Sequence, residues 1–161
     1  MLSADELAGV VDLFGALTRA ELRSAAAELA FKRSGEFDPE SFGTAVDDAV
    51  RSYHLLDVPS RAVDGEATVN EDAPEWVIPG PAAFPELPTH GADLPHILDI
   101  GHRAVDHDVA VRHAEERFRA DAAAAVDAGD GDRITTLRDV SYELETWGGL
   151  DLTAARARFE E

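Results

Sequence analysis

The sequence contains no cysteine, which excludes a disulfide framework, a thiolate nucleophile and a cysteine-ligated zinc site. Its amino terminus lacks a basic segment followed by a long apolar run, so we expect no signal peptide. No stretch approaches the roughly 18 consecutive apolar residues of a membrane span. The G-x-S-x-G, P-loop and G-x-G-x-x-G motifs are also missing. These absences predict a soluble, cytoplasmic, non-enzymatic protein without a cofactor or a membrane partner.

Lysine is almost absent as well: Lys32 is the only lysine among 14 basic residues, against 33 acidic residues and a formal net charge of −19. Such self-repulsion weakens a compact state in dilute buffer. At about 1 M salt the Debye length falls to roughly 3 Å, and the repulsion is screened. The acidic excess, the many alanines and the loss of lysine are together typical of proteins from halophilic archaea. The charge therefore indicates the solvent more than it indicates a partner.

Three helices are predicted within the first 54 residues. Ser3 with Glu6, and Thr18 with Glu21, have the spacing of capping boxes, and Pro39 occupies a favoured first helical position. The expected buried stripes are Leu7, Val10, Val11 and Phe14; Leu22, Ala25, Ala26 and Leu29; and Phe42, Ala45, Val46, Ala49 and Tyr53.

The pattern then changes to two short strands, expected at 54–59 and 75–79, around a polar segment with a turn at Asp64-Gly65. Three helices followed by two strands around a polar turn is the order expected of a winged helix, a relative of the helix-turn-helix. We therefore predict a mostly α protein in which residues 1–80 form a three-helix winged-helix-like unit with a short β-hairpin.

Six of the eight prolines lie between residues 74 and 95. This composition predicts an extended connector over 81–95. Beyond it we predict a long helix over 94–128 and a second helix over 134–147, which together make a helical hairpin, and then a short helix capped by Thr153. Residues 96–161 are thus a helical part, either separate from the first unit or in one compact domain with it.

The best candidate for a metal site lies on the predicted long helix. His102 and Asp106 are one helical turn apart there, the spacing at which two side chains reach one ion. His113 shares their face but lies about 10 Å further along the axis, too far for the same ion. A solvent-facing polar stripe explains these residues more simply, so a metal-dependent helical enzyme is the least favoured interpretation.

A nucleic-acid site would need the third helix to carry base-reading side chains. That helix offers Arg51 but also three carboxylates, and no Asn, Gln or Lys, whereas base recognition uses Arg, Asn or Gln. Arg61 on the polar segment, and Arg19 and Arg23 on the second helix, are the other candidate contacts. Ordinary surface ion pairs explain these arginines more simply. DNA binding is therefore an alternative with weak support.

A protein-binding surface is easier to support. Trp76, Phe84 and Leu87 lie in or beside proline-rich irregular segments, where exposed aromatic groups would form a partner surface. The competing interpretation is that they tether the connector to the two halves.

The run from Leu2 to Val58, above all FGALTRAEL, AELAFKR and YHLLDV, resembles a family of uncharacterised proteins of halophilic archaea, known as a domain of unknown function. The resemblance implies a haloarchaeal cytosolic protein and assigns no activity or site residue. More distantly, the first 80 residues resemble archaeal winged-helix regulators, from which the acidic third helix departs. We therefore expect a regulatory or adaptor protein that contacts another protein or itself, with a winged-helix transcription regulator as the alternative.

Overall fold

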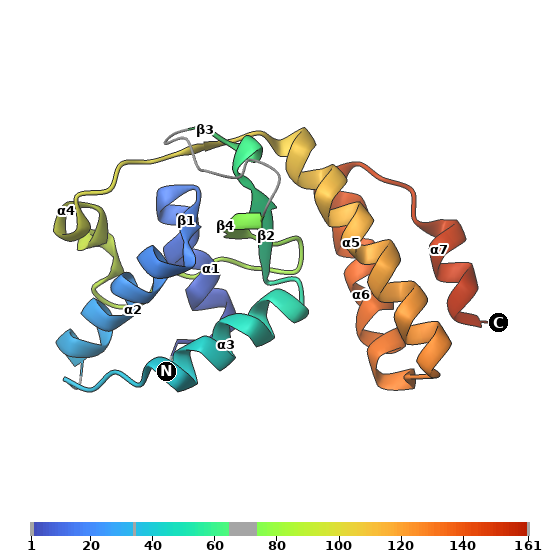
Figure 1. Ribbon diagram of the computed structural model, residues 1–161, viewed down its shortest axis with the longest axis horizontal. Helices are drawn as coiled ribbons and strands as arrows, with labels where there is room; N and C mark the ends of the chain where they lie inside the picture. Colours follow the sequence, from blue (N-terminus) through green and yellow to red (C-terminus); the bar gives the residue numbers. More distant parts are fainter. Residues whose placement is uncertain (1, 34, 65–73, 161) are drawn as a thin grey trace. The chain divides into compact units, whose positions relative to one another are not determined.

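The computed structural model describes residues 2–33, 35–64 and 74–160, and it divides into two compact units (Figure 1). The first unit is Met1–Asp106 and the second is His107–Glu161. The first unit therefore extends well past residue 80 and includes the proline-rich segment. The described residues form seven α-helices and short strands, so the prediction of a mostly α fold is confirmed.

The first unit begins with three helices, and each start follows the cap expected from the sequence. The helices are α1 (Ala4–Phe14), α2 (Arg19–Arg33) and α3 (Pro39–Arg51). The Ser3 side chain accepts a bond from the Glu6 N–H while the Glu6 carboxylate accepts one from the Ser3 N–H, and Thr18 and Glu21 exchange the same pair of bonds. These bonds satisfy N–H groups that a helix start leaves without a partner.

A three-stranded antiparallel sheet completes the first unit. Its strands are β1 (Leu17–Thr18), β4 (Pro74–Pro79) and β2 (Leu55–Pro59), in the order β1-β4-β2. The predicted pairing of the two longer strands is therefore confirmed, and Leu56 lies opposite Ile78. A second pair joins β3 (Val63–Asp64) to β5 (Ala104–Val105), with the short 3-10 helix η1 (Ser60–Ala62) between β2 and β3. Most of the polar segment predicted between the strands lies outside the described residues.

The core of this unit lies between the three helices and the sheet. Its members on α1, α2 and α3 are the predicted stripe residues together with Ala8, whereas Ala45 is half-buried, and the sheet adds Leu17, Leu55 and Val77. Tyr53, which was predicted on the stripe of the third helix, is buried but lies beyond the end of α3. Phe31, at the end of α2, is 75% exposed.

The prediction of one long helix over 94–128 is wrong. A 3-10 turn, η2 (Gly91–Asp93), leads into the short α4 (Leu94–Leu98), and α5 (His107–Ala128) starts separately. Between them, the Arg103 N–H donates to the Phe14 carbonyl and the Asp106 N–H to the Ala62 carbonyl. Hydrogen bonds to the rest of the first unit therefore replace those that a continuous helix would have made.

The second unit is built from α5, α6 (Gly131–Gly148), α7 (Thr153–Ala157) and the 3-10 turn η3 (Arg158–Glu160). Helices α5 and α6 form the predicted helical hairpin, and Figure 1 shows them side by side in orange. Phe118 of α5 is fully buried and meets Phe159 of η3 edge to face, with 6.5 Å between ring centroids. Among the helices described, none is long and apolar enough to cross a bilayer.

Candidate functional site: an anchored ridge on the first unit

The proline-rich segment after β4 is fixed to α1. The Phe84 N–H donates to Oδ1 of Asp5 (3.1 Å between N and O), and the Glu86 N–H donates to the Asp5 carbonyl (3.0 Å). Gly9 permits this approach, because a Cβ atom at that position would overlap the backbone of Glu86. Figure 1 shows the segment running between β4 and α4 beside α1.

Four consecutive residues of this segment, Phe84 to Leu87, are exposed, and we call them the 84–87 ridge. Phe84 is 75% exposed and Leu87 is 46% exposed, whereas Ala82 before the ridge and Pro88 after it are buried. Both ends of the ridge are thus seated on the protein, and its two large apolar side chains face solvent. Two of the three expected protein-contact residues therefore lie together on this surface.

The third residue, Trp76, does not belong to the ridge, because its side chain is only 3% exposed. Arg103 covers it: the guanidinium carbon lies 4.7 Å from the Trp76 ring centroid. The same guanidinium binds both carboxylate oxygens of Glu21 (2.7 and 2.8 Å) and the Ala16 carbonyl (3.0 Å). Trp76 is therefore part of a clamp that fixes residues 99–106 to α2 and the sheet.

Glu21 is the charged centre of this clamp. Partial burial alone would raise the pKa of Glu21, but the bonds from Arg103 and Thr18 outweigh it and hold that pKa below its usual value. The capping box of α2 and the clamp thus use the same carboxylate. The sequence reveals the first role through the spacing of Thr18 and Glu21, but it has no signal for the second.

The outer face of α3 is strongly acidic. Its exposed residues are Glu40, Ser41, Thr44, Asp47, Asp48 and Arg51. Arg19, at the start of α2, donates to Asp47 (3.1 Å) and to Asp57 of β2 (3.1 Å). Arg19 is therefore already shared between two carboxylates, one of them on this face. The remaining candidates for nucleic-acid contact lie on α2 (Arg23), at the end of α3 (Arg51) and on η1 (Arg61), and all three are exposed.

The helical spacing assumed for the candidate metal ligands does not occur. His102 and Asp106 lie in the segment between α4 and α5, outside any helix, while His113 lies on α5 in the second unit. Within the part of the chain that the structure describes, no group of three or more His, Cys, Asp or Glu side chains is placed to hold a metal ion.

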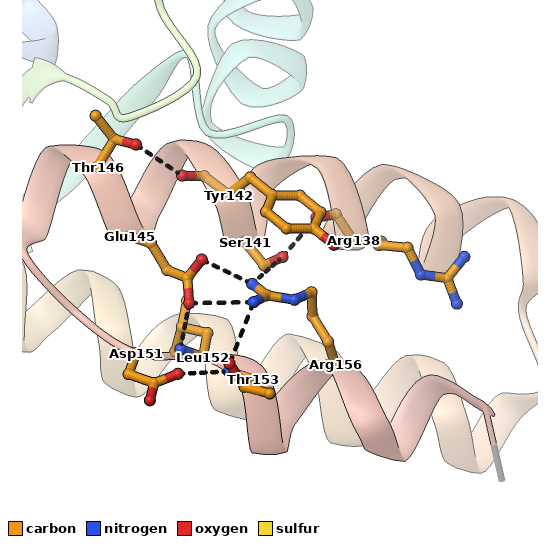
Figure 2. A network of polar contacts seen from close by, with 9 residues as sticks. All are labelled: Arg138, Ser141, Tyr142, Glu145, Thr146, Asp151, Leu152, Thr153 and Arg156. Carbon is orange, nitrogen blue, oxygen red and sulfur yellow. Dashed lines mark hydrogen bonds and ion pairs between the residues drawn. The ribbon is translucent and has the colours of Figure 1, made fainter.

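The second unit contains a polar network that holds α7 against α6 (Figure 2). Arg156 of α7 donates to the buried Ser141 hydroxyl (3.1 Å) and pairs with Glu145 (3.0 Å), and its guanidinium stacks on the Tyr142 ring at 4.2 Å. The bond from Arg156 and then that from the Leu152 N–H hold the pKa of Glu145 below its usual value, and Glu145 raises the pKa of Arg156. These contacts join α7 to α6, so the network explains how the two helices pack.

Two residues of the candidate site escaped the sequence analysis. Asp5 fits the ordinary preference for acidic residues in the first turn of a helix, so its role as anchor of the ridge left no trace. Gly9 gave a usable signal, because a glycine inside an otherwise apolar helical stripe often marks a close packing contact.

The comparisons with known proteins give one match. The model of a family of unknown function, DUF7109, matches residues 5–161. No curated protein and no solved structure matches the chain.

Proposed function

We propose that this chain, which belongs to the family of unknown function DUF7109, is a non-enzymatic regulatory or adaptor protein that binds another protein through the 84–87 ridge. One observation carries the proposal: Phe84 is 75% exposed on a backbone that is bonded to α1. Aromatic anchors supply much of the affinity of protein interfaces, and a backbone that is already fixed loses little entropy on binding.

We also infer that the protein works in concentrated salt, as proteins of halophilic archaea do. The inference rests on the net charge of −19 and the single lysine. Binding experiments therefore belong in molar KCl, where apolar contacts contribute more than charge pairs.

The test is affinity purification from the native host in molar KCl, with bound proteins and nucleic acids both identified. The matched pair of variants is Phe84→Ala and Phe31→Ala, because both side chains are 75% exposed in the first unit. We expect a protein that the wild type and Phe31→Ala retain, and that Phe84→Ala loses at least about tenfold, as removal of a central aromatic anchor does. Equal retention by all three chains would refute the proposal.

A winged-helix DNA-binding regulator is the second candidate, and the topology of the first unit favours it. The elements of this unit follow one another in the order α1-β1-α2-α3-β2-η1-β3-β4, and the sheet order is β1-β4-β2. Three helices followed by paired strands support a winged helix, in which α3 would enter the major groove. The acidic face of α3 and the pairing of Arg19 oppose this role.

Two variants of the first unit test the DNA candidate directly. The double variant Asp47→Asn/Asp57→Asn removes two negative charges and the ion pairs of Arg19, so it should raise the affinity for duplex DNA if this face contacts DNA. The single variant Arg19→Ala should lower that affinity. If neither variant changes the affinity for duplex DNA, this face does not contact DNA.

A further inference from the structure

A hollow of about 270 Å³ lies between the last turns of α2 and the start of α3, and we call it the α2 hollow. Three of its lining residues, Ala26, Leu29 and Phe42, belong to the core of the first unit and are at most 5% exposed. Two exposed carboxylates, Glu36 and Asp38, also line it. The α2 hollow therefore combines an apolar floor with an acidic rim.

Phe31 lies on the same helix as this hollow and next to Ala30, which lines it. The Phe31 side chain is 75% exposed, so it does not fill the hollow of its own chain. An apolar cavity of about 150 Å³ already holds benzene, so the α2 hollow is large enough for a phenylalanine ring. The first unit thus carries a large exposed apolar side chain and, beside it, an apolar site that could receive such a side chain.

The charges beside Phe31 are opposite to those at the rim of the hollow. Lys32, the only lysine of the chain, follows Phe31 and makes no ion pair within the described residues. Arg33 comes next, and Nη2 of its guanidinium lies 3.8 Å from the Glu6 carboxylate. A ring flanked by these cations matches a hollow rimmed by Glu36 and Asp38. Since molar salt weakens such surface pairs, we assign them the orientation of the contact and assign the affinity to the ring.

A second copy of this chain supplies both halves of the match. A two-fold interface uses the same surface on both partners, so a contact from Phe31 of one copy to the hollow of the other occurs twice. Phe31 and the lining residues Ala30 and Arg33 lie within one turn of α2, which lets both contacts form around one axis. The repulsion between two chains of net charge −19 is screened at about 1 M salt.

We propose that two copies of this chain form a symmetric dimer in molar salt, in which Phe31 of each copy fills the α2 hollow of the other. The proposal goes beyond the proposed function, because it concerns a different surface and a different partner. Its failure leaves the role of the 84–87 ridge unchanged.

Sedimentation equilibrium of the full chain in molar KCl tests the proposal. Phe31→Ala removes the ring, and Ala30→Phe places a ring in the hollow of its own chain. The control is Ala20→Phe, which adds the same side chain at an exposed position in the first turn of α2. The two test variants are measured separately and as an equimolar mixture, and circular dichroism verifies that each variant is folded.

We expect the wild type and Ala20→Phe to form dimers of similar affinity. Phe31→Ala and Ala30→Phe should each raise the dissociation constant at least about tenfold, as the loss of a central aromatic anchor does. Their mixture should form a tighter dimer than either variant alone, because Phe31 of the Ala30→Phe chain still meets an open hollow on the Phe31→Ala chain.

A monomeric wild type would overturn the proposal, as would a dimer whose affinity Phe31→Ala leaves unchanged. A mixture that dimerises no better than the separate variants would show that the ring does not enter the hollow, and it would also overturn the proposal. So would a host protein that takes the place of the second copy and is lost from Phe31→Ala in the affinity purification.

Discussion

Replacing Gly9 by alanine tests whether the 84–87 ridge is fixed to α1 as closely as its contacts imply. Alanine favours a helix interior over glycine by about 1 kcal/mol. At Gly9, however, the new Cβ atom would overlap the backbone of Glu86. If the ridge stays in place, overpacking costs roughly 1–3 kcal/mol. If the ridge moves away, two hydrogen bonds to Asp5 are lost at about 1 kcal/mol each.

Either response costs about 2 kcal/mol, and the helix preference of alanine returns about 1 kcal/mol of this. Gly9→Ala should therefore be less stable than the wild type by about 1 kcal/mol. The matched control is Gly43→Ala, because Gly43 lies inside α3 and a Cβ atom there would meet nothing within 4 Å. That variant should gain about 1 kcal/mol. The helix preference is common to both variants, so the difference between them, about 2 kcal/mol, measures the contact with the ridge alone.

The assay is urea unfolding in molar KCl followed by circular dichroism, with hydrogen exchange at the amides of Phe84 and Glu86. Gly9→Ala should unfold at lower urea than the wild type, and Gly43→Ala at higher urea. A displaced ridge also predicts faster exchange at both amides in Gly9→Ala. If Gly9→Ala is as stable as Gly43→Ala and both amides stay protected, the reasoning about the ridge is wrong.

Three further predictions concern the two ion-pair clusters. Arg103→Met should lower the free energy of unfolding by about 1–3 kcal/mol, because it leaves the partly buried Glu21 carboxylate without its partner; urea unfolding measures the loss. Since folding lowers the pKa of Glu21, its contribution is complete above the unfolded pKa and is lost as pH falls through the folded pKa. The urea midpoint should therefore fall more steeply below about pH 5 in the wild type than in Arg103→Met. Glu145→Gln should release α7 from α6 and speed limited proteolysis after residue 149, whereas Thr146→Ala, at an exposed position of the same helix, should not.

The first three helices could be predicted because the residues that cap a helix lie within a few positions of its start in the sequence. Ser3 with Glu6, and Thr18 with Glu21, form the hydrogen bonds that their spacing implied, and the helix stripes are buried almost as expected. The two strands were also predicted, from short apolar runs that each end at a proline. Such a run does not by itself distinguish a strand from a buried helical segment, so the order of the elements around the polar segment carried this prediction.

The long helix failed because periodicity does not sense tertiary hydrogen bonds. Ile97, Ile100 and Ala104 have helical spacing, yet Asp99 adopts a left-handed conformation (φ 54°) that ends α4. The bonds that then hold this segment come from Phe14 and Ala62, more than 40 residues away in the sequence. His102 and Asp106 would lie one helical turn apart only on that long helix. The candidate metal site therefore depended on a wrong prediction of secondary structure.

The ridge shows how a proline-rich segment can be fixed to a folded unit. Prolines that would make an isolated connector extended also remove N–H groups and fix φ, so the segment can be held by few bonds. Asp5 supplies two of them, one through its side chain and one through its carbonyl, and Oδ1 of the same side chain lies 3.9 Å from Nε2 of His54. An acidic residue at the start of a helix thus fixes a segment about 80 residues away while keeping its favourable position near the helix dipole.

Asp5→Asn should keep the bond from the Phe84 N–H through its amide oxygen, whereas Asp5→Ala should lose it. Partner binding that is preserved in the asparagine variant and weakened in the alanine variant would therefore separate anchoring of the ridge from the charge of Asp5, and equal binding by both variants would show that the anchor does not matter for recognition.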